Sequence, residues 1–218
     1  GISIAVHLLN LLCIPAIVLV IYYKKWRNTT AKGSCIALLI SFVIVALILY
    51  GLVPGFIEIA QYFELFFVNV LHCSFNTGVL IYAILLVACF IWAIHELYRQ
   101  KSATAIRVSF LLSVFLSGMP FIGDNLWIPV LFTIALGVYL FTCKKLPIRI
   151  LNLAAISIFV IFIGYSSYAL LLIRSSAHTP MNQNAPDNVF DLSSYLNREQ
   201  YGDRPLFYGE TLNSTPVY

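Results

Sequence analysis

Long apolar runs, separated by short polar connectors, occupy the first 173 residues of the chain. A helix of about 20 apolar residues crosses the roughly 30 Å hydrocarbon core of a bilayer, since each residue rises about 1.5 Å. The pattern therefore predicts an all-α fold, a polytopic transmembrane bundle of about six helices. The expected spans are residues 2–22, 33–53, 77–97, 105–122, 125–142 and 148–173.

Two of the expected boundaries depend on glycine and proline. Gly51 and Pro54 follow the second span, and a proline inside a helix removes a backbone hydrogen bond and clashes with the preceding turn. We therefore expect the second helix to end here. Pro120 and Gly123 likewise turn the fourth span into the fifth. The fourth span then has only about 18 residues, which suits a helix with little tilt or one partly buried by its neighbours.

Residues 55–72 are amphipathic rather than uniformly apolar. At 100° per residue, their polar side chains fall within an arc of about 140°, and apolar side chains fill the rest of the helix surface. The polar positions are Glu58, Gln61, Glu64, Asn69 and His72. Two interpretations fit: a helix lying in the outer membrane interface, or a loop helix partly buried against the bundle. In either case the polar stripe would border whatever the outer surface binds.

A polar tail, residues 174–218, follows the apolar part of the chain. Asp187 or Asn188 suits the N-cap of a helix, and Gly202 suits its end. The apolar residues between them share one helix face and are Val189, Phe190, Leu192, Tyr195 and Leu196. We therefore expect an amphipathic helix of about 14 residues within this tail.

The composition supports the membrane class. Hydrophobic residues make up 61% of the 218 and charged residues only 10%, whereas a soluble domain carries about 25% charged residues. The chain shows no phosphate-binding glycine loop, no serine-hydrolase or zinc-protease motif and no nucleic-acid signature, so no nucleic-acid partner is expected. The five cysteines lack metal-ligand spacing, and neither a disulfide framework nor a metal site is predicted.

Basic residues are confined to alternate connectors. Of the 13 Lys and Arg residues, ten fall in the connectors around residues 24–32, 99–107 and 144–149. Lys and Arg resist translocation, so these connectors are expected in the cytosol. Of the nine acidic residues, only Glu96 falls on that side. Both ends of the chain, including the tail, are therefore expected outside the cytosol.

Polar groups near the outer ends of the first and last spans are candidate substrate-binding residues. His7 and Asn10 lie three apart and so share a helix face. Polar side chains at that depth are costly unless they are paired or face a cavity. Tyr165 and Tyr168, beside two serines, form a second polar interruption. Both groups have a structural alternative, because such side chains also join neighbouring helices through hydrogen bonds.

Charged residues of the tail form a third candidate group. The candidate substrate-binding residues of this group are Arg174, Arg198, Asp203 and Arg204. The last three lie near a Gly-Asp-Arg-Pro turn. Charges beside a turn usually form a solvated surface. Arginine, however, also binds phosphate oxygens well through its forked donors. Both interpretations stay open at this point.

Three segments resemble a known family. They are GISIAVHLLNLLCIPAIVLVIYYKK (1–25), FIGYSSYALLLIRS (162–175) and PMNQNAPDNVFDLSSYLNREQYGDRPLFYG (180–209). They resemble the later part of a bacterial membrane family described as domain of unknown function 2723, which is grouped with protein O-mannosyltransferase-like enzymes. The segment from the tail is the most specific of the three, because it is long and unusual in composition.

The resemblance implies the type C glycosyltransferase fold and the chemistry that goes with it. Such enzymes take a sugar from a polyprenyl-phosphate donor, which is a substrate, and transfer it outside the cytosol to a protein hydroxyl or envelope glycan. The implied partners are the lipid bilayer, the lipid-linked sugar and the acceptor, and the implied location is a bacterial inner membrane. No cofactor is evident, and the need for a divalent metal is left open.

One feature of the family is missing from the chain. Its catalytic acid lies in the first outer loop, which would precede Gly1, and the chain begins without Met. We therefore expect residues 1–218 to be a fragment that is inactive alone, and we assign no catalytic residue. Glu58 and Asp124 are acids on the outer side, but they match no motif of the family.

Two functions from different classes remain. The first is a glycosyltransferase-like membrane protein, as the resemblance implies. The second is a non-catalytic scaffold or binding subunit of a cell-envelope assembly, which the missing acid motif favours. A transporter has less support, because no expected span carries a charge at mid-membrane depth.

Overall fold

The fold was determined as a computed structural model. It describes residues 8–123, 125, 127–177, 180, 182, 184–197, 199 and 202, and the side chains of Leu8 and Leu9 are not included. Every regular element in the described part of the chain is helical. The all-α prediction is therefore confirmed.

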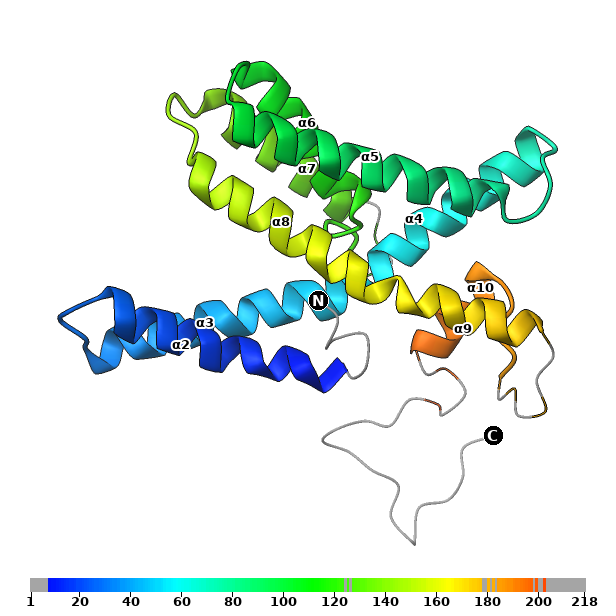
Figure 1. The fold of residues 1–218 in the computed structure, drawn as a ribbon, viewed down its shortest axis with the longest axis horizontal. Coiled ribbons are helices and arrows are strands. Elements are labelled where there is room, and N and C mark those ends of the chain that lie inside the picture. The colour runs from blue at the N-terminus through cyan, green and yellow to red at the C-terminus, as the bar shows by residue number, and fades with distance from the viewer. Residues whose placement is uncertain are drawn as a thin grey trace, which may run out of the picture.

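The helices follow one another with short connections (Figure 1). A 3-10 turn, η1 (Leu8–Leu12), leads into α2 (Cys13–Lys25). The next helical segment comprises α3 (Ala31–Ala46), η2 (Leu47–Leu52), α4 (Val53–Leu65) and η3 (Phe66–Val70). The remaining helices are α5 (Thr77–Arg99), α6 (Ala103–Leu116), α7 (Trp127–Thr142), α8 (Ile148–Tyr165), α9 (Ser167–Ser176) and α10 (Val189–Asn197).

The second predicted span does not end at Pro54, which corrects the sequence prediction. The helix runs without a break from Ala31 to Val70, a length of 40 residues. The π-helical turn η2 precedes the proline, and the amide of Val53 donates to the carbonyl of Ile48, five residues back. This wider turn makes room for a ring that a regular helix would not accommodate. The helix bends here, so α3 and α4 point in different directions (Figure 1).

Two groups of helices extend from the middle of the molecule towards the same end (Figure 1). Helices α5 to α8 form a bundle, and α2 pairs with α3 as a separate hairpin. The main core lies where α4, α5, α8 and α10 meet, with Ile57, Phe90 and Val189 among its buried residues. A second core, including Phe110 and Leu140, fills the bundle.

Three helical segments in the described part of the chain are long and apolar enough to cross a membrane: Ala31–Val70, Thr77–Arg99 and Ile148–Ser176. Helices α6 and α7 are apolar but shorter. The apolar helices make this a membrane protein, while the expected number of six passes stays a prediction. The third and sixth predicted spans, 77–97 and 148–173, agree closely with α5 and with α8 plus α9.

Helix α6 ends early because the chain turns sharply after Leu116. Gly118 has φ 75°, a left-handed conformation that favours glycine. A Cβ added to Gly118 would lie 2.2 Å from the carbonyl carbon of Gly55 in α4. The two backbones therefore touch, and this contact fixes the α6–α7 connection against α4.

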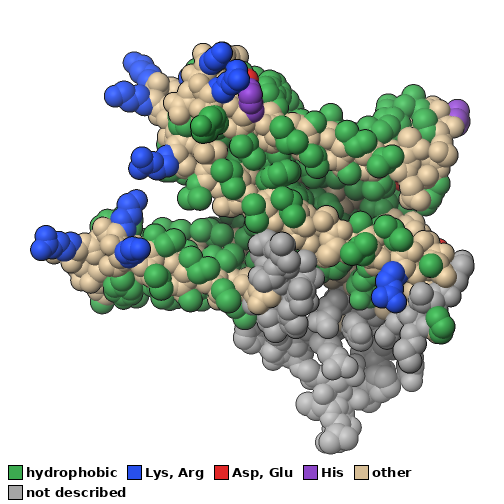
Figure 2. Space-filling model, in the orientation of Figure 1, with side chains coloured by type: hydrophobic (Ala, Val, Ile, Leu, Met, Phe, Trp, Pro, Cys, Tyr) green, Lys and Arg blue, Asp and Glu red, His purple; other side chains and the backbone are tan. Residues whose placement is uncertain are grey.

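Lys and Arg side chains gather at the ends of both groups of helices, on the left in Figure 2. This end carries the α2–α3, α5–α6 and α7–α8 connections (Figure 1), which are the basic connectors of the sequence. The predicted clustering of these connectors on one side is therefore seen in the fold. Which side of a membrane they face stays a prediction.

The tail helix is present and shorter than expected. Asn188 is its N-cap, because its Oδ1 accepts hydrogen bonds from the amides of Phe190 and Asp191, both at 2.9 Å. Helix α10 then covers nine residues rather than about 14, ending at Asn197. Val189 is buried in the core around α4, and Phe190 and Leu196 pack against the same core. The predicted apolar face therefore docks on the bundle.

Candidate functional site

The junction of η1, η2 and the start of α9 brings together residues that are far apart in the sequence. Tyr165 ends α8 and is only 3% exposed, and it shares a small core with Leu11 and Ile48. Tyr168, in the first turn of α9, packs against the same core. The rings of Tyr165 and Tyr168 stack with their centroids 5.5 Å apart. We call this group the tyrosine junction.

Helices α8 and α9 are joined by one residue, and this explains the position of the two tyrosines. The Ser166 side chain donates to the carbonyl of Ile163 at 2.7 Å, which competes with the regular helical pattern. The Tyr165 hydroxyl, by contrast, is buried and makes no hydrogen bond to the described residues. A buried hydroxyl without a partner costs free energy, so the junction offers an unused donor and acceptor.

Helix α10 is tied to α4, which also contacts the tyrosine junction. Gln61 of α4 donates to the carbonyl of Val189 at 3.5 Å, which ties α10 to the same helix that carries Phe56. The ring of Phe56 lies 6.2 Å from that of Tyr165.

The structure brings some of the predicted site residues together and separates others. Asn10 is half-buried in η1, next to Leu11 of the tyrosine junction. Arg174 is exposed in the last turn of α9, nine residues beyond Tyr165, and is not part of the junction. The other predicted site residues lie outside the described residues: His7, Arg198, Asp203 and Arg204. Asp124 also lies outside them.

Glu64 differs from its predicted position in the polar stripe that borders the outer surface. It is only 1% exposed, and its carboxylate accepts hydrogen bonds from the backbone amides of Asn76 and Val79. It therefore caps the N-terminus of α5 from a neighbouring helix. Gly78 permits this close packing, since a Cβ there would lie 2.6 Å from the Glu64 backbone nitrogen. Of the two interpretations of residues 55–72, the packed helix agrees with this burial.

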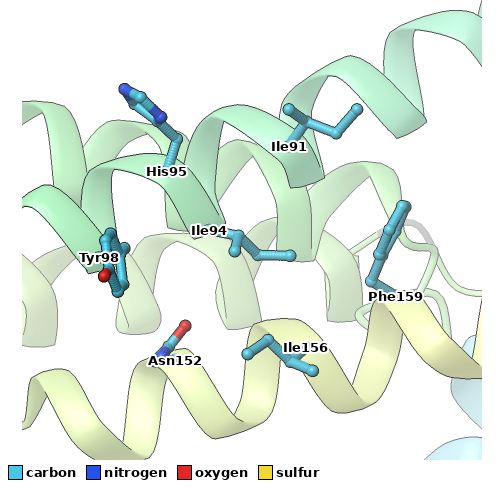
Figure 3. Close-up of a pocket in the computed structure, with 7 residues that line it drawn as sticks. All are labelled: Ile91, Ile94, His95, Tyr98, Asn152, Ile156 and Phe159. Carbon is cyan, nitrogen blue, oxygen red and sulfur yellow. The ribbon is translucent and has the colours of Figure 1, made fainter.

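A groove lies between α5 and α8, away from the tyrosine junction (Figure 3). This groove has a volume of about 460 Å³ and is lined mainly by apolar side chains such as Ile94, Ile156 and Phe159. Asn152 points from α8 towards α5, and His95 and Tyr98 of α5 also line the groove (Figure 3). The Asn152 Oδ1 is buried and makes no hydrogen bond to any residue in the described ranges. The groove suits a lipid chain better than a sugar.

The described side chains include no group of three or more His, Cys, Asp or Glu residues that could hold a metal ion. The five cysteines are free. The tyrosine junction carries two hydroxyl groups and two stacked rings, of which Tyr168 is half-buried and Tyr165 is buried in the packed core. The described residues of the junction include no carboxylate that could act as a general base.

The comparison with known proteins gives one match. Residues 1–30 match the family described as protein O-mannosyl-transferase TMEM260 N-terminal domain. No curated protein matches the chain, and no solved structure matches it. The matched segment includes all of η1 and α2. Over these residues the chain is similar to an O-mannosyltransferase domain, which makes it glycosyltransferase-like.

Proposed function

We propose that the protein takes part in sugar transfer from a polyprenyl-phosphate donor to a protein hydroxyl or envelope acceptor. The observation that carries the proposal is a contact. Leu11, inside the segment that matches the O-mannosyl-transferase family, packs against Tyr165. A residue of the matched segment thus lies in the same small cluster as Tyr165 and Tyr168, which the sequence predicted as substrate-binding residues.

The chemistry assigns only part of the reaction to the described residues. Sugar transfer requires a carboxylate to take the acceptor proton and donors to stabilise the leaving phosphate. The Tyr165 hydroxyl is buried without a partner among the described residues, and Tyr168 stacks beside it. In the proposal the half-buried Tyr168 contacts the sugar or its phosphate. The buried Tyr165 hydroxyl gains its missing hydrogen-bond partner when the junction opens to admit the substrate, and neither side chain acts as the base.

The proposal also includes an orientation. The basic connectors gather at one end of the molecule (Figure 2), and such connectors remain in the cytosol by the positive-inside rule. Transfer would then occur on the opposite side, where α9 and α10 lie. Membership of the bacterial family and an inner-membrane location stay predictions.

The test is transfer of a labelled sugar from polyprenyl-phosphate mannose by the full-length protein, reconstituted in liposomes with a peptide acceptor. Tyr165→Phe removes only one hydroxyl, and we expect it to lower kcat/KM about tenfold, which corresponds to roughly 1.4 kcal/mol of lost transition-state binding. Tyr139→Phe in α7 is the matched control, because this exposed tyrosine lies outside the junction.

Three results would count against the proposal. One is a folded wild-type protein that transfers no sugar from any polyprenyl-phosphate donor, which would favour the scaffold function. A second is equal activity of the Tyr165→Phe and Tyr139→Phe proteins, which would remove the tyrosine junction from the site. A third is a loss in Tyr165→Phe that follows a fall in folded protein, as judged by the melting temperature.

A further inference from the structure

A small pocket lies at the cationic end of the bundle, far from the tyrosine junction. It has a volume of about 200 Å³ and forms where the end of α5, the start of α6 and the α7–α8 connection meet. Its polar lining comes from Gln100, Arg107 and Lys144. Its apolar lining comes from Ile106, Leu146 and Ile148. We call it the basic-end pocket.

The lining of the basic-end pocket carries positive charge and no acidic side chain among the described residues. Arg107 and Lys144 both line it, and its described lining residues include neither Asp nor Glu. The pocket also borders the first turns of α6, whose N-cap Ser102 accepts a hydrogen bond from Ala105 at 3.3 Å. A helix N-terminus carries a partial positive charge, so all three contributions favour an anion.

Arg107 is held in place before any ligand arrives. Its Nη2 donates to the carbonyl of Cys143 at 3.3 Å, just beyond the end of α7. Its guanidinium also lies 5.6 Å from the centre of the Phe141 ring. The Nε atom is buried and makes no hydrogen bond within the described part of the chain. A partly buried cation without a carboxylate partner is costly, and an anion in the pocket would offset that cost.

The apolar lining distinguishes between possible anions. A free inorganic ion gains nothing from Ile106, Leu146 and Ile148, whereas an amphiphile places its phosphate on the cations and its glycerol and chains on the isoleucines and leucine. Basic pockets between helices at a membrane surface bind the headgroups of anionic lipids for the same reason.

We propose that the basic-end pocket binds the phosphate headgroup of an anionic phospholipid. Arg107 and Lys144 bind the phosphate, Gln100 supplies a further polar contact, and the apolar lining accommodates the start of the acyl chains. This site is separate from the proposed sugar-transfer site and does not depend on it. Its occupancy would anchor the α5–α6 and α7–α8 connections at the membrane surface.

The experiment uses native mass spectrometry of the delipidated full-length protein in detergent micelles. Dioleoyl-phosphatidylglycerol, dioleoyl-phosphatidylcholine and inorganic phosphate are added in separate titrations. We expect the phosphatidylglycerol adduct to form with the highest affinity and Lys144→Gln to weaken it about three- to tenfold, since one cation near a lipid headgroup contributes on the order of 1 kcal/mol. Lys145→Gln is the control, because it removes the same charge from the neighbouring residue, which is not a lining residue.

Each other outcome overturns a part of the proposal. Equal weakening by Lys144→Gln and Lys145→Gln would mean general attraction to a basic surface rather than a pocket. Equal affinity for phosphatidylcholine would exclude recognition of headgroup charge, and inorganic phosphate that displaces phosphatidylglycerol at equal concentration would assign the site to a free anion. Arg107→Gln is measured too, but Lys144→Gln decides the outcome, since Arg107 also holds the end of α7.

Discussion

Replacing Glu64 tests the packing of α4 against α5 in the most direct way. The N-cap position of α5 is Asn76, which has φ 69° and makes no side-chain cap bond of its own to the described residues. The carboxylate of Glu64 takes over this function by accepting from the amides of Asn76 and Val79, the latter at 3.1 Å. Helix α5 is therefore capped from another helix, and the cap also joins the two helices.

The magnitude follows from the two hydrogen bonds. An unsatisfied buried donor costs about 1–3 kcal/mol, and a carboxylate at a helix N-terminus contributes about 0.3–1 kcal/mol, more when buried. Glu64→Gln keeps the shape of the side chain, but only one of its two terminal atoms can still accept a hydrogen bond. The other is an NH2 group, which faces the second backbone N–H donor to donor. We expect a loss of about 1.5–3 kcal/mol from Glu64→Gln and about 3–5 kcal/mol from Glu64→Ala, which also leaves a cavity.

The assay is hydrogen exchange of the backbone amides of residues 76–79 in micelles, together with reversible unfolding by denaturing detergent. A loss of 1.5–3 kcal/mol corresponds to exchange about 10 to 150 times faster, since about 1.4 kcal/mol is a factor of ten. Glu96→Gln is the matched control, because Glu96 lies in the last turns of the same helix, where a negative charge opposes the dipole. Unchanged exchange at residues 76–79 in Glu64→Gln, relative to Glu96→Gln, would refute the capping function.

Three further substitutions or reagents test other parts of the fold. Gly118→Ala should destabilise the protein by about 2–4 kcal/mol, because it combines a left-handed backbone with a clash against Gly55. Gly123→Ala is the control, since Gly123 has φ 71° but no described atom within 4 Å of an added Cβ. It adds backbone strain only and should cost about 1–2 kcal/mol. Equal melting temperatures for the two would exclude the clash. Asn188→Ala should cost about 1 kcal/mol and speed exchange of the first amides of α10 about fivefold; exchange at the wild-type rate would show that Asn188 is not the cap. A membrane-impermeant maleimide added to intact cells should label Cys73 and reach Cys143 only after permeabilisation, and the reverse pattern would invert the proposed orientation.

Local signals in the sequence predicted much of the fold. The length of α5 follows from apolar run length, and capping chemistry limited the start of α10 to Asp187 or Asn188, because both signals depend on neighbouring residues alone. The structure selects Asn188. The error at Pro54 has a physical reason, since a π-helical turn before the proline cannot be recognised from the residue type. Helix propensity gives the free-energy cost of a proline in a helix, but tertiary packing decides whether other contacts offset that cost.

The candidate site was predictable only in part. Tyr165 and Tyr168 stood out as polar residues in an apolar helix, but their contact with Leu11 joins segments that are more than 150 residues apart. The function of Glu64 was missed because a helix-capping carboxylate and a solvent-facing one look the same in a sequence. Likewise, the basic-end pocket joins Arg107 and Lys144, each of which belongs to a connector that also satisfies the positive-inside rule.

The tie between Gln61 and Val189 has a consequence for the order in which the protein is made. The two residues are 128 positions apart, so the ribosome completes α4 long before it reaches α10. Throughout that interval, the part of α4 that α10 covers stays without its final neighbour. A nascent chain released before residue 189 would consequently keep this apolar strip uncovered, which favours aggregation.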